Sequence, residues 1–201
     1  MGAGTFTTLA IAQWLNKLQE PGVRRRAERL YQQLDMLQPL RQQARRELLA
    51  EGRKHTITAK LRKIPSIGPI RSALVVALIQ TPNRFRTKRQ LWTYSGLGLE
   101  TRDSGEYHYV KGQVRRRKKQ KFIRGLNRDY NHDLKALFKA AAIRATILPG
   151  PLQDFYQRSL DKGIKPTMAR LTLARKIAAI TLTLWKKGEN FDADKVKPQA
   201  A

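Results

Sequence analysis

The sequence contains no cysteine and only three histidines, His55, His108 and His132, among its 201 residues. Without cysteine the chain cannot form disulfides, thiolate zinc sites or a catalytic thiol. The histidines are scattered and lack HxxxH or HxH spacing, which argues against a metal site built on them. We therefore expect no metal ion or other cofactor to be bound by these residues themselves.

Acidic residues are scarce as well. There are 15 Asp and Glu against 41 Lys and Arg, so the formal net charge is +26. Such an excess repels itself in a compact protein unless a polyanion neutralises it. A solubilising surface is the simpler interpretation, but a charge of this size favours a nucleic-acid-binding protein. The hydrophobic content of 41% still suffices for a core.

Long apolar runs are missing too. Arg170, Arg175 and Lys176 interrupt the most apolar stretch near the C-terminus, which argues against a membrane span. The opening residues MGAGTFTTLAIAQWLNKL have no basic region before the apolar patch and no small-residue cleavage site, so no signal peptide is predicted. We expect a cytoplasmic protein that is associated with the nucleoid through DNA and has no membrane partner.

Residues 21 to 56 have the pattern of a long helix that begins at Pro21-Gly22. Apolar residues recur three and four positions apart between charged ones, as in a coiled coil; they are Ala27, Leu30, Leu34, Leu37, Ala44 and Leu48. Pro39 is expected to kink this pattern or split it into two helices. The pattern is compatible with self-association through residues 23 to 50, and equally with a helix that packs on its own domain.

Residues 57 to 80 predict a short helix from Thr58 to Lys63, a turn at 65–69 and a second, apolar helix. The segment resembles a helix-hairpin-helix element, whose turn reads P-G-I-G-P before a basic residue and an alanine. Six positions match and Ser66 stands where the first glycine is expected; the matches are Pro65, Ile67, Gly68, Pro69, Arg71 and Ala73. In that motif the turn amides and the start of the second helix face a DNA phosphate, which predicts contacts from Ser66, Ile67, Gly68 and Arg71. A turn that only packs two helices together fits the motif equally well.

Glycines at 96, 98, 105 and 112 punctuate a segment that predicts a short helix capped by Asn83 or Thr87, followed by a small β-hairpin around Tyr107 and Tyr109. From Tyr107 to Arg128 the sequence has nine basic residues and no acidic one. The nine are Lys111, Arg115, Arg116, Arg117, Lys118, Lys119, Lys121, Arg124 and Arg128. A solvated face would normally mix both signs, so this stretch predicts a strip that contacts phosphates.

The remaining sequence predicts helices at 122–147 and 153–161, and a last long helix capped by Thr167 that ends at Lys186-Lys187-Gly188. The expected fold is mainly α, a helical domain with a helix-hairpin-helix element and a small β-hairpin, preceded by a coiled-coil-like helical arm. The expected boundaries are 1–56 for the arm, 57–188 for the domain and 189–201 for a flexible tail.

No catalytic constellation stands out from spacing alone. The carboxylates are few and dispersed, and Tyr107, Tyr109 and Tyr130 lack the histidines that a tyrosine recombinase needs. By backbone chemistry Asp103, Ser104 and Gly105 are turn residues.

Four phrases nevertheless occur together and in order. They are LRKIPSIGPIRSALVVALI, RFRTKRQLWTYSGLGLETRDSG, KFIRGLNRDYNHDLKALFKAAA and YQRSLDKGIKPTMARLTLARKIAAITLTLWKKG. From about Leu61 to Gly188 this order resembles the C-terminal half of IS110/IS116/IS902-type transposases, and the helix before it resembles their coiled-coil region. The chain departs from the family at Ser95, where a small residue such as alanine is common, and at Leu99, where proline is frequent. The basic run from Arg115 to Lys121 also replaces a shorter family phrase.

The resemblance implies DNA transposition by a serine-dependent, RNA-guided recombinase, with Ser104 as the nucleophile and DNA and a guide RNA as partners. Arg102, Lys111 and Arg115 are the nearest cations in sequence to stabilise charge on the attacked phosphate. The family pairs this serine with a RuvC-like half that holds Mg²⁺ on four acidic residues. These 201 residues contain no such half, so we expect the chain to be inactive alone. The alternative is a non-enzymatic DNA- or RNA-binding helix-hairpin-helix protein, including a truncated transposase remnant.

Overall fold

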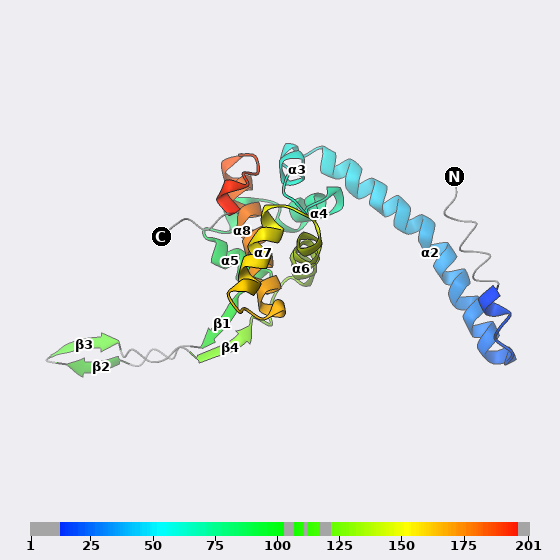
Figure 1. Cartoon of the computed structure of the whole chain (residues 1–201), viewed down its shortest axis with the longest axis horizontal. Helices are drawn as coiled ribbons and strands as arrows, with labels where there is room; N and C mark the ends of the chain where they lie inside the picture. Colours follow the sequence, from blue (N-terminus) through cyan, green and yellow to red (C-terminus); the bar gives the residue numbers. More distant parts are fainter. Residues whose placement is uncertain (1–12, 103–106, 111, 117–121, 197–201) are drawn as a thin grey trace. The chain divides into compact units, whose positions relative to one another are not determined.

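A computed structural model describes residues 13–102, 107–110, 112–116 and 122–196. The chain divides into two compact units, residues 1–48 and residues 49–201 (Figure 1). The last residues of the first long helix belong to the second unit. Gly52 is buried there, and a Cβ on it would lie 2.8 Å from the Cβ of Ala73.

Helix α2 (Pro21–Arg53) forms most of the described part of the first unit. It begins at Pro21 as predicted, and the Glu20 carboxylate accepts hydrogen bonds from the amides of Gly22 and Val23 at 2.9 and 2.6 Å. Pro39 lies inside the helix and does not split it in two. The predicted heptad leucines are exposed, with Leu30 at 58%, Leu34 at 46% and Leu37 at 59%.

The second unit is built from helices around α8 (Pro166–Lys187), which confirms the mainly α prediction. The others are α3 (Thr56–Leu61), α4 (Pro69–Ile79), η1 (Pro82–Arg84), α5 (Lys88–Tyr94), α6 (His132–Ile147), α7 (Pro151–Asp161) and η2 (Asp194–Val196). The buried faces of α6 and α8 each combine alanines with larger apolar residues, and the small residues let the two helices approach closely. Thr87 caps α5 in a reciprocal capping box with Gln90.

Four short strands form two antiparallel pairs instead of one hairpin (Figure 1). Strand β1 (Leu99–Arg102) pairs with β4 (Phe122–Leu126), and β2 (Tyr107–Val110) pairs with β3 (Gln113–Arg116). We call the two pairs together the ribbon. The predicted helix from 122 was wrong at its start, because residues 122–126 complete the ladder with β1 and α6 begins only after Asn131, whose side chain caps it at the Leu134 amide.

The C-terminal part differs from prediction in two places. Helix α8 begins at Pro166 after Lys165 and not at a Thr167 cap, since proline fits the first turn of a helix. The expected flexible tail from 189 is packed as far as η2, because Phe191 lies against the core and Val196 is fully buried. Among the described residues, no helix combines the length and the apolar character that crossing a membrane requires.

Candidate nucleic-acid interface

The helical hairpin, residues 56–79, consists of α3, a tight turn and α4. At its centre Ser66 has a φ of +74°, a left-handed conformation that serine rarely adopts. This is the position at which a helix-hairpin-helix turn has its first glycine, the one residue for which such a φ carries little steric cost. The left-handed residue of this turn is therefore a serine at the position where the motif has glycine.

The start of α4 is open to a ligand. Gly68 is the N-cap residue, no side chain caps the helix, and a Cβ on Gly68 would meet nothing within 4 Å. The first amides of a helix have no intrahelical acceptor, and the helix dipole is positive at this end. Arg71 adds a guanidinium that donates to the Ser66 carbonyl through Nη1 at 3.0 Å and fixes the turn.

Ile67 does not take the role predicted for it. Its amide already donates to the Ile64 carbonyl at 3.0 Å, and its side chain is only 2% exposed within the core. Ser66 is also buried, and its hydroxyl has no hydrogen-bond partner among the described residues. Among the four predicted residues, the geometry leaves Gly68 and Arg71 at the open side of the turn.

Two lysines of this hairpin are engaged inside the molecule. Lys60 donates its Nζ to the Gly188 carbonyl at the end of α8, and the Lys63 Nζ donates to Asn190 Oδ1 at 3.1 Å. Cations at a helix C-terminus interact favourably with its dipole. The two lysines therefore anchor the hairpin to the end of α8 and to the segment that follows it.

The ribbon starts from a tightly packed joint after α5. Gly96 has a φ of +63°, and a Cβ there would lie 2.5 Å from Cγ of the Tyr130 ring. The backbone N–H of Asn127 donates to the Gly98 carbonyl at 3.0 Å, and the backbone N–H of Asn131 donates to the Tyr94 carbonyl at 2.8 Å. These bonds hold together the two ends of the ribbon where it leaves the helical core.

Ser104 lies in residues 103–106, outside the described part, as do Lys111 and the basic residues 117–121. The register still defines their borders, because Arg102 pairs with Phe122 and Tyr107 pairs with Arg116. Segments 103–106 and 117–121 thus connect the same two strand pairs. The strand pairing therefore places the residues that flank the serine segment (102 and 107) opposite those that flank the basic segment (122 and 116). Sequence spacing alone did not predict this arrangement.

The other predicted cations are distributed along the ribbon and just after it. Arg115 is exposed on β3 and Arg128 is exposed in the loop that follows β4. Arg102, Arg116 and Arg124 lie on strands β1, β3 and β4. Ser95, in contrast, is fully buried, and its hydroxyl donates to the Leu91 carbonyl at 2.7 Å, so it is a structural residue.

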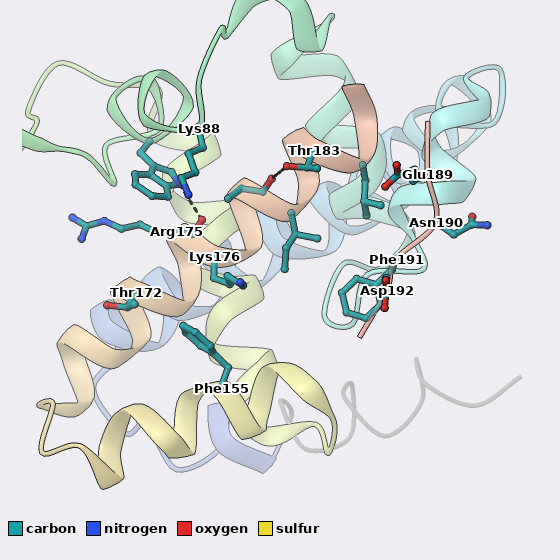
Figure 2. Close-up of a pocket in the computed structure, with 14 residues that line it drawn as sticks. Lys88, Phe155, Thr172, Arg175, Lys176, Thr183, Glu189, Asn190, Phe191 and Asp192 are labelled. Atoms are coloured by element: carbon teal, nitrogen blue, oxygen red, sulfur yellow. Dashed lines mark hydrogen bonds between the residues drawn. The ribbon is translucent and has the colours of Figure 1, made fainter. Parts of the chain in front are cut away.

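A groove of about 520 Å³ runs along one face of α8 and was not anticipated from sequence (Figure 2). Trp92 from α5, Phe155 from α7 and Phe191 line it together with Lys88 and Lys176. Burial, together with the nearby charge of Lys88, lowers the pKa of Lys176. Glu189 and Asp192 also line the groove, so its charge is mixed, unlike that of the basic strip.

Arg175 joins α8 to α5 at the edge of this groove. Its Nε donates to the Leu97 carbonyl at 2.6 Å, and its own carbonyl accepts from Trp92 Nε1 at 2.9 Å. Burial lowers the pKa of Arg175. No motif in the sequence marks this pair, because the two residues lie 83 positions apart. The pair holds the helix that leads into the ribbon.

Among the described residues there is no cluster of three or more histidine or acidic side chains that could hold a metal ion. What the described site offers is a set of cations and backbone amides, with Glu100 and Asp129 as separate acidic residues beside Arg128. This arrangement suits the positioning of phosphates.

Residues 58–157 match the family model described as Transposase IS116/IS110/IS902 family. Over 116 residues the chain is 29% identical to the insertion element IS116 uncharacterized 44.8 kDa protein of Streptomyces clavuligerus. That match covers 58% of this chain and 26% of the relative, so the chain corresponds to about a quarter of that protein. The family match contains the helical hairpin from residue 58 onward, α5, the ribbon, α6 and the first part of α7. Residues 58–157 therefore form a region of the IS116/IS110/IS902 transposase family.

Proposed function

We propose that the chain is the DNA-binding part of a serine-dependent transposase and that Ser104 is its nucleophile. The observation that carries the proposal is the register of the ribbon, which brings the borders of the Ser104 segment opposite those of the basic segment 117–121. A serine that attacks DNA needs fixed cations close to the phosphate. We propose that the ribbon carries the serine and the cations on one structural element.

In this reaction the Ser104 hydroxyl loses its proton and its oxygen bonds to a DNA phosphorus. The phosphodiester bond to one deoxyribose oxygen breaks, and that oxygen takes up a proton. The phosphoserine ester keeps the phosphoryl group activated, so the strand can be rejoined without ATP. We assign stabilisation of the negative charge to Arg102, Lys111 and Arg115.

The helical hairpin is the second proposed contact with DNA. Its open α4 N-terminus at Gly68 and the neighbouring Arg71 suit one backbone phosphate. Contacts of this kind fix the register of the protein on DNA without reading its sequence. The hairpin then holds the duplex while the ribbon reaches the phosphate that reacts.

Helix α2 is the proposed site of self-association. Its heptad leucines Leu30, Leu34 and Leu37 are all at least 46% exposed, although a coiled coil would bury them. A dimer through residues 23–50 would bring two serines to two DNA strands. Replacing Leu34 by Glu is expected to shift the molar mass from oligomer to monomer in light scattering, whereas Met36→Glu, outside the heptad positions, is not.

Mg²⁺ enters this scheme only through a RuvC-like acidic half of the transposase, since the described residues offer no metal cluster. A guide RNA and association with the nucleoid are further parts of the proposal, drawn from the family.

Trapping of a covalent intermediate tests the nucleophile. The chain is incubated with nicked suicide DNA, alone and with the acidic half of a family member added as a separate protein, and adducts are separated under denaturing conditions. We expect an adduct with the acidic half present, and its loss in Ser104→Ala. The double variant Tyr107→Phe/Tyr109→Phe should retain it, which excludes a tyrosine ester.

An adduct that persists in Ser104→Ala, or its complete absence in the presence of the acidic half, would contradict the nucleophile. If no adduct forms and the wild-type chain and Ser104→Ala bind DNA equally, the hypothesis of a non-enzymatic DNA-binding protein is correct. DNA and RNA of the same sequence, compared at several salt concentrations, separate a DNA-binding protein from an RNA-binding one.

A further inference from the structure

Strand β2 carries two large aromatic side chains that are mostly exposed to solvent. Tyr107 is 66% exposed and Tyr109 is 77% exposed, and Val114 on the paired strand is 56% exposed. Isolated exposed apolar residues are common, but a contiguous exposed group on a short strand pair usually marks an interaction site. Neither the proposed nucleophile nor the phosphate strip uses these side chains.

The three residues share one face of the β2–β3 pair. Tyr107 and Tyr109 are two positions apart on a strand, so their side chains point the same way, and Val114 lies directly opposite Tyr109. Strands rise about 3.4 Å per residue, which separates the two tyrosine Cα atoms by about 6.8 Å. That distance is about twice the 3.4 Å spacing of bases along a nucleic-acid strand, so one base has room between two rings.

The charge of this part of the sequence selects the partner. Nine basic residues and no acidic one lie between Tyr107 and Arg128, and Arg115 is exposed on the opposite face of the same strand pair. An apolar peptide would gain nothing from these cations, and an anionic strand would. Exposed aromatic rings beside a basic groove are the means by which proteins hold unpaired bases, since every base has a stacking face.

We infer that Tyr107 and Tyr109 form a stacking platform for the unpaired bases of a DNA strand. The inference rests on the proposed DNA-binding function and adds to it a contact with bases in addition to phosphates. A strand pair with only one neighbour per strand is marginally stable by itself, so the bound DNA also stabilises the platform. The platform starts three residues after Ser104, so it holds the bases next to the scissile phosphate unpaired.

The test uses single-stranded DNA with 2-aminopurine, whose fluorescence falls when the base stacks on an aromatic ring. The full chain is compared with Tyr107→Leu, Tyr109→Leu and the double variant, which keep apolar bulk but lack a ring. The matched variants Tyr107→Phe and Tyr109→Phe keep the ring and lose the hydroxyl. Val114→Ala controls for apolar area on the same face.

Each leucine variant should bind the single strand about 5-fold to 100-fold more weakly, because stacking on one ring contributes about that factor. Quenching of 2-aminopurine should disappear in the double leucine variant. Both phenylalanine variants and Val114→Ala should bind and quench like the wild type. The slope of log affinity against log salt should stay the same in all variants, since no cation is removed.

Failure of this inference can be separated from failure of the proposed function. If the wild type binds no DNA at any salt concentration, the DNA-binding function itself is wrong. If it binds DNA but the leucine variants bind and quench equally well, the platform is wrong and the function stands. Binding confined to duplex DNA, or quenching seen only with an RNA strand of the same sequence, would also overturn the platform.

Discussion

The helical hairpin and the ribbon are the two proposed contacts with DNA, and they are held in place in opposite ways. The hairpin turn is part of the core, where Ile64 and Ile67 are at most 2% exposed. The ribbon consists of two separate two-stranded sheets, and Tyr109 on one of them is 77% exposed. At the hairpin the fold fixes the backbone of the turn, so the proposed phosphate contact uses the backbone more than side chains. On the ribbon the described side chains of Tyr109, Val114 and Arg115 are exposed, and our proposal is that bound DNA orders them.

The largest expected effect is a loss of folding stability at the helical hairpin. Ile67→Ala should lower the free energy of unfolding by about 2–5 kcal/mol, because it opens a cavity beneath the turn. Val114→Ala on the ribbon should change it by less than about 0.5 kcal/mol, because that side chain is exposed. Urea unfolding monitored by tryptophan fluorescence measures both. Equal losses would show that the ribbon is part of the cooperative core and would remove the contrast.

The second largest loss of folding stability is expected at Gly96, where the ribbon leaves the helical core. Gly96→Ala should cost about 2–4 kcal/mol, since it combines a φ of +63° with a Cβ placed 2.5 Å from the Tyr130 ring. Gly112→Ala is the matched control: its φ is +74° but a Cβ meets nothing within 4 Å, so only about 1 kcal/mol is expected. Thermal unfolding of both variants isolates the contribution of the Tyr130 contact. A Gly112 variant as unstable as the Gly96 variant would attribute the whole effect to backbone strain.

The helices were largely predictable because their signals are local. Pro21, the Thr87 cap and the Pro65–Pro69 turn each lie where the structure starts or ends an element. The β1–β4 ladder was not predictable, because Phe122–Leu126 follows a basic run and becomes a strand only through its partner 20 or more residues earlier. Val196 was missed for the same reason, since a single apolar residue in a polar tail gives no periodic signal.

The site divides in the same way. The turn motif indicated Ser66, Gly68 and Arg71 from sequence, while burial of Ile67 and the Trp92–Arg175 pair depend on contacts across the fold. The facing borders of the Ser104 and basic segments also depend on strand register, which a one-residue slip would change.

At the hairpin, relief of backbone strain in the turn is expected to raise the free energy of unfolding by a smaller amount. Ser66→Gly should stabilise the chain by about 1 kcal/mol, because glycine adopts a φ of +74° without the steric cost and the unpartnered hydroxyl is removed. Gln80→Gly at the other end of α4 has a φ of +64° but no buried hydroxyl, so its gain should be smaller. Differential scanning calorimetry resolves the two. Destabilisation by Ser66→Gly would mean that the serine makes a contact that favours it over glycine.

Phosphate contact at the same turn can be tested without disturbing the fold. Gly68→Ala should leave the melting temperature unchanged, because the added methyl group meets no atom of the chain within 4 Å. It should weaken duplex binding several-fold, about 1 kcal/mol, if a phosphate comes close to the α4 amides. Unchanged duplex affinity would remove the hairpin from the DNA interface and leave the ribbon as the whole contact.

The smallest expected effect belongs to a single cation of the ribbon. Arg115→Gln removes one exposed charge, so the slope of log affinity against log salt on duplex DNA should fall by about 0.9 in magnitude, with little change in the melting temperature. Lys54→Gln is the control, because the Lys54 Nζ already pairs with the Glu51 carboxylate at 2.6 Å and is expected to release no counterion from DNA. Filter binding between 50 and 200 mM salt covers the range in which such slopes are measured. A change of slope in the control as large as that in Arg115→Gln would mean that DNA senses the net charge of the whole chain and not the ribbon in particular.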